Sequence, residues 1–223
     1  MSSAKITMFS CVNPAEIKLA TEHLEANRRM ACNVVSDAVV IPMPSVEEFN
    51  KWFVGGLRSE KLDATGYDFI INVEPDASVA NPEAWDDRFT KYDYMGAPWP
   101  ASWKRLRHYA HSHGEVPENV LVGNSGFCMM SRKFVQTLRK LSNEFQGYSF
   151  DRDGGCDFYL CIAKARTLRK DGVRIPEPSV ASRFSVERSP YLGSFGVHNW
   201  VSVHGRQVSL KENRFKLFKD LVK

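Results

Sequence analysis

Short, nearly continuous runs of apolar residues recur along the chain and are separated by segments of helical periodicity. Three such runs, Lys5–Val12, Ala31–Val35 and Asp68–Val73, predict strands. Runs of this length and composition, bounded by polar residues, are typical of strands buried on both faces of a parallel sheet. Between the first two runs, apolar residues fall on one face of a predicted helix that ends near Arg29. The order strand, helix, strand, helix, strand indicates an α/β fold.

Helix-start signals support these assignments. Asn13-Pro14 followed by Glu16, and Ser45 followed by Glu48, are N-capping patterns. Ser131 is a third predicted N-cap. The remaining predicted elements are strands at Tyr92–Gly96 and Gly126–Met130, and helices over residues 131–141, from near Cys156 to Leu168, and from about Leu210.

Length and composition fit one soluble globular domain over residues 1–223, with 43% hydrophobic and 25% charged residues. The formal net charge of +4 permits an anionic partner without requiring one. We expect no membrane partner, because the start of the chain lacks the apolar core of a signal peptide and no apolar run approaches membrane-spanning length. Five scattered cysteines without a Cys-x-x-Cys pair favour a reducing cytoplasm, which would be a host cytoplasm for a viral protein.

The third predicted strand ends in two carboxylates, Glu74 and Asp76, separated by Pro75. Ligands of open α/β sheets bind just outside the carboxyl ends of the strands. Two carboxylates at that position can hold a divalent cation and, through it, a diphosphate. The alternative is a plain strand followed by a turn, with Asp76 capping the next segment.

Two later segments carry a family resemblance. Tyr92-Asp93-Tyr94-Met95-Gly96-Ala97-Pro98-Trp99 is followed by Gly123-Asn124-Ser125-Gly126. In this order they resemble the Y-D-Y-I-G-A-P-W and G-N-G-G motifs of a GT-A-type glycosyltransferase-like family of microbes and viruses, catalogued as a domain of unknown function. The resemblance spans roughly residues 67–199. The chain departs from the family pattern at Glu74-Pro75-Asp76, where Gln-x-Asp is usual, and at Ser125, where a glycine is usual.

The resemblance implies one GT-A-like domain with a mostly parallel central sheet flanked by helices. It also implies a nucleotide-diphosphate sugar donor, with a UDP-sugar expected first, and a Mn²⁺ or Mg²⁺ ion that neutralises the leaving diphosphate. Asp76 is then the expected direct ligand, and Glu74 contacts the ion through water or contacts the sugar. His198 stands where many enzymes of this fold add a further ligand; the alternative is a packing histidine beside Phe195 and Trp200.

The resemblance makes Asp157 the expected general base; it follows Gly154-Gly155 at the start of a predicted helix, where its carboxylate would face a cleft. An ordinary N-cap is the alternative, and Glu187 is a second choice for the base. By fold analogy, the nucleotide is expected at the first two strand ends, which the sequence places at Ser10 and Val12 and at Ser36 and Asp37.

Residues expected to contact the sugar or the acceptor lie in two segments. Asn124, Ser125 and Gly126 offer an amide, a hydroxyl and close backbone approach, although a plain turn has the same composition. The segment Trp99–His113 mixes basic and aromatic residues and is predicted to be a loop. Its members with an expected acceptor contact are Trp99, Trp103, Lys104, Arg105 and Arg107.

That loop favours DNA as the acceptor, because cations contact phosphates and aromatic rings stack on extruded bases. The specific hypothesis is a viral or phage DNA-base glycosyltransferase that acts on 5-hydroxymethylcytosine, or else on hydroxymethyluracil. A solvated basic loop or a lid over the diphosphate would look the same. Two alternatives remain: transfer to surface polysaccharide or lipid-linked sugar, and a sugar- or DNA-binding module without catalysis.

Overall fold

A five-stranded mixed sheet forms the centre of the computed structural model, which describes residues 4–119, 121–189, 191–203 and 206–209. The strand order is β2-β1-β3-β6-β5. β1 pairs in parallel with β2 and β3, whereas β6 pairs antiparallel with β3 and β5. The predicted α/β class is confirmed, and the sheet is mixed rather than purely parallel, because β6 runs opposite to the other strands. The strands of this sheet are β1 (Ile6–Val12), β2 (Asp37–Pro42), β3 (Phe69–Val73), β5 (Tyr94–Met95) and β6 (Phe127–Ser131).

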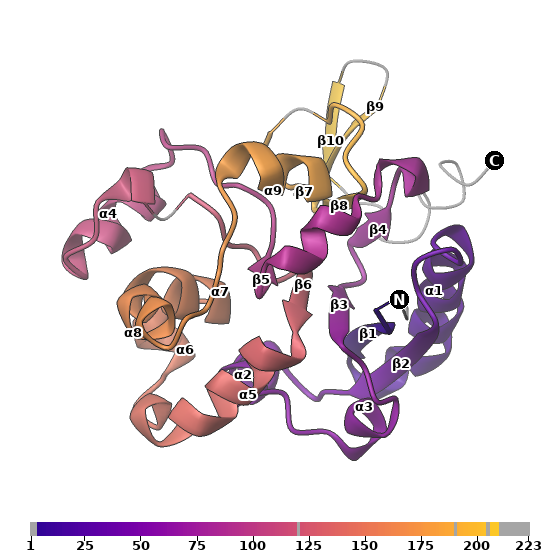
Figure 1. Ribbon diagram of the computed structural model, residues 1–223, viewed down its shortest axis with the longest axis horizontal. Coiled ribbons are helices and arrows are strands. Elements are labelled where there is room, and N and C mark those ends of the chain that lie inside the picture. Colours follow the sequence, from indigo (N-terminus) through magenta and orange to yellow (C-terminus); the bar gives the residue numbers. More distant parts are fainter. Residues whose placement is uncertain (1–3, 120, 190, 204–205, 210–223) are drawn as a thin grey trace.

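A second sheet of three short strands has the order β4-β8-β7, and a hairpin of two strands follows it in the chain. The helices surround the main sheet (Figure 1). The short strands are β4 (Ala77–Val79), β7 (Ser185–Val186), β8 (Gly196–His198), β9 (Trp200–Val203) and β10 (Arg206–Ser209). The α-helices are α1 (Ile17–Met30), α2 (Val46–Val54), α3 (Glu60–Ala64), α4 (Lys104–Ser112), α5 (Arg132–Leu141), α6 (Phe150–Asp153), α7 (Cys156–Phe158), α8 (Ala165–Lys170) and α9 (Pro178–Phe184).

The predicted helix starts are confirmed by hydrogen bonds. The side chain of Asn13 accepts from the backbone N–H of Ala15, ahead of a short 3₁₀ turn (Pro14–Glu16) that leads into α1. Ser45 accepts from the N–H of Glu48, and Ser131 accepts from the N–H of Phe134. Each bond satisfies a backbone donor that the first turn of a helix cannot pair internally.

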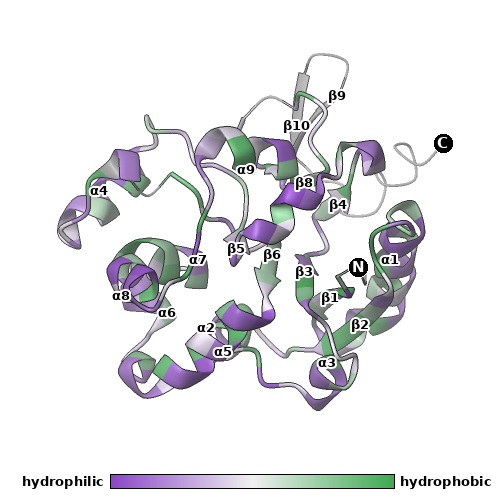
Figure 2. Cartoon of the chain, viewed as in Figure 1, coloured by the Kyte–Doolittle hydropathy of each residue, from purple (hydrophilic) through white to green (hydrophobic). Residues whose placement is uncertain are grey.

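The main sheet separates two apolar clusters, because successive strand residues point to opposite faces. Phe9 of β1 and Ile70 of β3 pack into one cluster with residues of α2, α5 and α7. Met8 and Ile71, their neighbours in sequence, pack into the other cluster with residues of α1 and the second sheet. Figure 2 shows the green, hydrophobic strands between helices whose outer faces are purple. β1 and β3 are therefore held rigidly on both faces up to their carboxyl ends.

Two predicted elements, a strand and a loop, have a different secondary structure. The predicted strand Ala31–Val35 is a turn after α1, and the strand lies instead at Asp37–Pro42. Val35 is buried, so its apolar character reflects packing below α1 rather than a place in the sheet. The predicted loop Trp99–His113 contains helix α4.

The predicted helix from Cys156 to Leu168 is divided into α7, a π-helical turn over Tyr159–Ala163, and α8. The predicted helix from about Leu210 lies outside the described residues. No helix within the described residues is long and apolar enough to cross a bilayer.

Candidate active site

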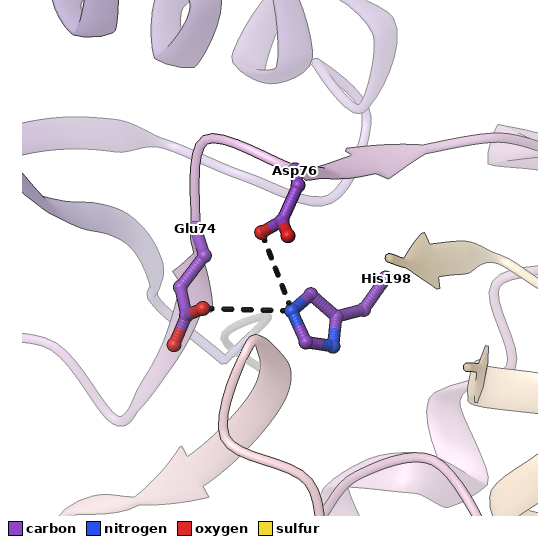
Figure 3. A group of neighbouring side chains, drawn as sticks. All are labelled: Glu74, Asp76 and His198. Carbon is purple, nitrogen blue, oxygen red and sulfur yellow. Dashed lines mark ion pairs between the residues drawn. The ribbon is translucent and has the colours of Figure 1, made fainter. Parts of the chain in front are cut away.

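Glu74, Asp76 and His198 converge at the carboxyl end of β3 (Figure 3). Each can offer one ligand atom, and these atoms lie within 4.8 Å of one another. Nε2 of His198 is 3.4 Å from a carboxylate oxygen of Glu74 and 3.4 Å from one of Asp76. Carboxylate oxygens with one imidazole nitrogen suit Mn²⁺ well and Mg²⁺ adequately.

The second sheet brings His198 to this position. β4 begins directly after Asp76, and in its antiparallel pairing with β8 residue Ala77 lies opposite His198. The backbone N–H of Asn199 donates to the carbonyl of Asp76 at 2.8 Å. On the other side, the N–H of Glu74 donates to the carbonyl of Gly126 at 2.9 Å. Both carboxylates are thus fixed relative to the imidazole by backbone hydrogen bonds.

Gly126 provides the space for the imidazole ring. A Cβ atom at this position would lie 2.1 Å from Nε2 of His198, which no real side chain permits. Gly126 was predicted as a substrate contact; in the structure its missing side chain also leaves the space that the ring occupies. The chemistry of the donor set and this cradle both fit a divalent cation.

The carboxylates of Asp76 and Glu74 determine the protonation of His198. Burial opposes protonation of His198, but Asp76 and Glu74 outweigh that effect and raise the pKa of its imidazole to about 10. The contacts at 3.4 Å are ion pairs rather than well-formed hydrogen bonds, since Nε2 has no hydrogen-bond partner of good geometry within the described residues. A cation and a proton therefore compete for the same nitrogen.

Asn124 lies behind the imidazole rather than in the open cavity. The residue is buried and has a left-handed backbone with φ of 66°. Its amide Nδ2 is 2.9 Å from Nδ1 of His198; an amide nitrogen can only donate, so an unprotonated Nδ1 is the acceptor in this hydrogen bond. Tyr94 donates from its hydroxyl to the carbonyl of Asn124 and fixes the turn. The amide nitrogen of Asn124 thus contacts His198, while the predicted contact with the sugar stays a prediction.

Asp157 lies near the cluster, one residue inside the short helix α7. Burial raises the pKa of its carboxyl to about 6, and the negative charges of Glu187 and Glu74 raise this pKa further. The hydrogen bond from the backbone N–H of Phe158 and the positive charge of His198 lower it. Its Oδ1 accepts the N–H of Phe158 at 2.8 Å. A carboxylate with this pKa can accept a proton near neutral pH. The structure therefore places the predicted base within the electrostatic reach of the predicted metal ligands.

Glu187 is also part of the site. It is buried at the end of β7, and its Oε1 lies 3.8 Å from Nδ1 of His198. At this distance the carboxylate acts on the imidazole through its charge, because 3.8 Å is too long for a hydrogen bond. This position suits support of His198 better than direct contact with an acceptor.

A cavity of about 500 Å³ opens in front of the cluster. Its wall comes from the carboxyl ends of β1, β2 and β3, from α2, and from the segment before α7. Among the described residues, the charged side chains that line it are all carboxylates. The lining residues are Cys11, Val12, Asn13, Glu16, Met43, Pro44, Ser45, Val46, Phe49, Asn50, Glu74, Pro75, Asp76, Ser125, Phe150 and Gly155.

Val12 and Ser125 line this cavity as the predictions require, but Ser10, Ser36 and Asp37 do not. Ser10 is buried within β1. Ser36 and Asp37 stand at the amino end of β2, where Ser36 donates to the carbonyl of Ile6 and Asp37 pairs with Lys5. The error follows from the misplaced second strand, whose true carboxyl end leads into residues 43–46.

The predicted acceptor residues divide into buried and exposed groups. Trp99 is buried and packs on Phe158, with its ring where a Cβ of Gly123 would otherwise lie. Trp103 is half-buried against Phe158 and carries the guanidinium of Arg188 at 4.5 Å from its ring centre. The exposed group consists of three cations on α4, namely Lys104, Arg105 and Arg107.

The structure also brings in Asn50, which the sequence analysis missed. Asn50 is a buried polar residue on the face of α2 that carries Phe53 and Val54. A lone amide on the apolar face of an amphipathic helix is a signal that could have identified it.

Comparison with solved structures identifies proteins of similar fold. A glycosyltransferase involved in the glycosylation of the major capsid of PBCV-1 aligns with a TM-score of 0.58 and 13% identity, covering 96% of this chain and 99% of that chain. A mutant Drosophila β1,4-galactosyltransferase 7 in complex with manganese, UDP-Gal and xylobiose aligns at 0.46, with 13% identity, over 86% of this chain and 69% of that one. The galactosyltransferase LgtC in complex with donor and acceptor sugar analogs aligns at 0.42, with 12% identity, over 86% of each chain. The first alignment shows a shared GT-A-type fold.

Among curated proteins, none matches the sequence. Residues 43–198 match a protein family, and this segment contains α2, the whole of β3 to β8, and every residue of the Glu74–Asp76–His198 cluster. The chain therefore belongs to the family described as "Protein of unknown function (DUF5672)".

Proposed function

We propose that this protein is a metal-dependent glycosyltransferase that moves a sugar from a nucleotide-diphosphate sugar, a UDP-sugar first, to an acceptor hydroxyl. The observation that carries the proposal is the three-ligand cluster of Glu74, Asp76 and His198, of which Glu74 and Asp76 line the 500 Å³ cavity. The shared fold with a capsid glycosyltransferase of PBCV-1 supports it. A bound Mn²⁺ or Mg²⁺ would supply Lewis-acid neutralisation of the leaving diphosphate.

The lining of the cavity makes donor binding depend on the cation. Glu16, Glu74 and Asp76 are the charged groups among the described lining residues, so a bare diphosphate would be repelled. Apolar lining residues such as Met43 and Phe49 are suited to a nucleoside, whereas the carboxylates suit the cation.

Asp157 is the proposed general base. In an inverting transfer, its carboxylate takes the proton of the acceptor hydroxyl as that oxygen bonds to the anomeric carbon. The bond from the anomeric carbon to the diphosphate oxygen breaks, and the electron pair leaves with the diphosphate. A pKa of about 6 keeps Asp157 ionised at neutral pH and still basic enough for this step. Glu187 is proposed to hold His198, in preference to serving as the base.

For the acceptor we favour a saccharide hydroxyl over a base in DNA. The DNA hypothesis requires free aromatic platforms, but Trp99 is buried and Trp103 packs between Phe158 and Arg188. The exposed cations of α4 still support 5-hydroxymethylcytosine in DNA as the second candidate. A cytoplasmic location remains a prediction.

The test is a donor screen with Mn²⁺, in which hydrolysis of UDP-, GDP- and dTDP-sugars is measured without acceptor. Saccharide acceptors and hydroxymethylated DNA are then added in separate arms. We expect hydrolysis of one donor class, loss of that hydrolysis in chelator, and transfer in one acceptor arm. Binding of nucleotide sugars without hydrolysis or transfer in any arm would instead indicate a non-catalytic binding module.

A further inference from the structure

Asn50 ties the wall of the donor cavity to the segment that carries Asp157. Its Oδ1 accepts the backbone N–H of Cys156 at 2.5 Å. Its Nδ2 donates to the carbonyl of Val46 at 2.7 Å, within the same helix. The side chain is buried, and both ends of its amide are therefore paired with backbone groups. An amide with these two bonds has one orientation, which fixes the distance between α2 and the start of α7.

The helix α7 depends on this contact. Gly155 is its N-cap residue and has no side chain to accept the first free N–H groups of the helix. Asn50 performs that capping role from a distant part of the chain. A Cβ on Gly155 would lie 2.6 Å from Oδ1 of Asp157, so the capped backbone and the carboxylate are packed closely.

Asn50 also lines the donor cavity, together with Val46 and Phe49 of the same helix and with Gly155. A ligand that fills the cavity would therefore touch the helix whose amide holds the Asp157 segment. The metal ligands Glu74 and Asp76 lie on the same cavity wall.

Building on the proposed function, we infer that Asn50 is a positioning residue that holds the segment carrying Asp157 beside the donor cavity, which Asn50 and Gly155 line. It acts through the N–H of Cys156 and does not itself contact the reacting atoms. The charged groups that act on Asp157 come from three elements: Glu187 from the end of β7, Glu74 from the end of β3, and His198 from β8.

Two substitutions of Asn50 separate positioning from general stability. Asn50→Leu removes the cap, which frees the segment to turn its carboxylate toward water, so the pKa of Asp157 should fall from about 6 toward 3.8. Asn50→Asp keeps an acceptor for the N–H of Cys156 but adds a negative charge, so the pKa should rise. Transfer by Asn50→Leu should fall about tenfold or more at all pH values, as misplacement of a catalytic group does. Asn50→Asp should regain most of that transfer at alkaline pH.

The primary readout is the ¹³C carboxyl titration of Asp157 in the full-length, metal-free protein, assigned by its loss in Asp157→Asn. Asn81→Leu is the matched control, because it removes a side-chain hydrogen bond to the carbonyl of Gly193 and should leave the titration unchanged. The inference is overturned if the two Asn50 variants do not move the midpoint in opposite directions. If the midpoints do not move in opposite directions while Asp157→Asn is inactive, the positioning role of Asn50 fails and the proposed function stands. If Asp157→Asn retains full transfer, the assigned base and the positioning role of Asn50 both fail.

Discussion

Nε2 of His198 lies 3.4 Å from a carboxylate oxygen of Asp76, although the two residues are far apart in sequence. The pairing of β4 with β8 creates this proximity, since β4 begins one residue after Asp76 and His198 ends β8. A sheet register is specific to one residue, because a slip by one would turn the imidazole to the opposite face. The proposed metal site thus depends on a small second sheet.

Substitution of Gly126 tests whether His198 binds the metal, because a side chain there would crowd the imidazole without removing any ligand atom. A Cβ at Gly126 would lie 2.1 Å from Nε2 of His198, so Gly126→Ala should displace the imidazole and weaken Mn²⁺ binding about 10–100-fold. Gly147→Ala is the matched control, because a Cβ there meets no atom within 4 Å. Isothermal titration calorimetry with Mn²⁺ measures both. Equal affinities for the two variants would show that His198 is not a ligand.

Removal of Asp76 tests the Lewis acid. Asp76→Ala should lower donor hydrolysis or transfer by about two orders of magnitude or more, because the leaving diphosphate loses its neutralising cation. Asp151→Ala, which removes an exposed acid close in sequence to the cavity residue Phe150, should retain activity. Circular dichroism checks that both variants fold. Full activity of the wild-type protein in excess chelator would contradict the metal assignment.

The part of the site that the sequence predicted is the part encoded locally. Glu74 and Asp76 follow an apolar run, and Asp157 follows a glycine pair, so each could be placed from its neighbours. The predicted second strand was wrong because the apolar residues Val34 and Val35 resemble a strand while packing against α1, and Ser36 and Asp37 therefore lie at the amino end of β2. The role of Asn50 could not be predicted, since it depends on a hydrogen bond to Cys156 across the fold.

Asp157→Asn should separate activity from stability. The amide keeps an oxygen for the N–H of Phe158 but cannot accept the proton, so transfer should fall roughly 10²–10⁴-fold while donor binding survives. The folded pKa of about 6 exceeds the ordinary value of 3.8, so the folded state binds more protons between these values. The ionised carboxyl therefore destabilises the fold fully above pH 6, and this penalty disappears as pH falls to 3.8.

Removing that charge should stabilise the protein by about 1–3 kcal/mol at neutral pH. Denaturant unfolding at pH 7 and at pH 4 measures the gain, which should shrink at the lower pH. A variant that loses activity and stability together would indicate a structural role for Asp157 instead.

The pH dependence of transfer gives an independent measure of the base. The ionised form of Asp157 is the active one, so at saturating Mn²⁺ the rate should be level above pH 6 and should fall about tenfold per unit below it. The acid limb should be absent from the residual activity of Asp157→Asn. A limb of the same midpoint in that variant would move the proton-accepting role to another group.

Substitution of the exposed cations of α4 distinguishes DNA from a saccharide as the acceptor. If DNA is the acceptor, Lys104, Arg105 and Arg107 contact its phosphates, and each lost contact should flatten the log–log salt dependence of DNA binding by about one unit. Since Trp99 is buried, stacking would fall to the partly buried Trp103 or Tyr109, and Trp103→Ala should then cost about 1–3 kcal/mol of single-strand affinity. We expect the other result, in which wild-type protein shows no salt-sensitive affinity for hydroxymethylated DNA and the triple alanine variant transfers sugar to a saccharide at the wild-type rate.

Donor hydrolysis without acceptor is the control and should be unchanged in every variant, because the proposed diphosphate site lies at Asp76. A steep salt slope that flattens in the triple variant would reverse our preference and make DNA the acceptor.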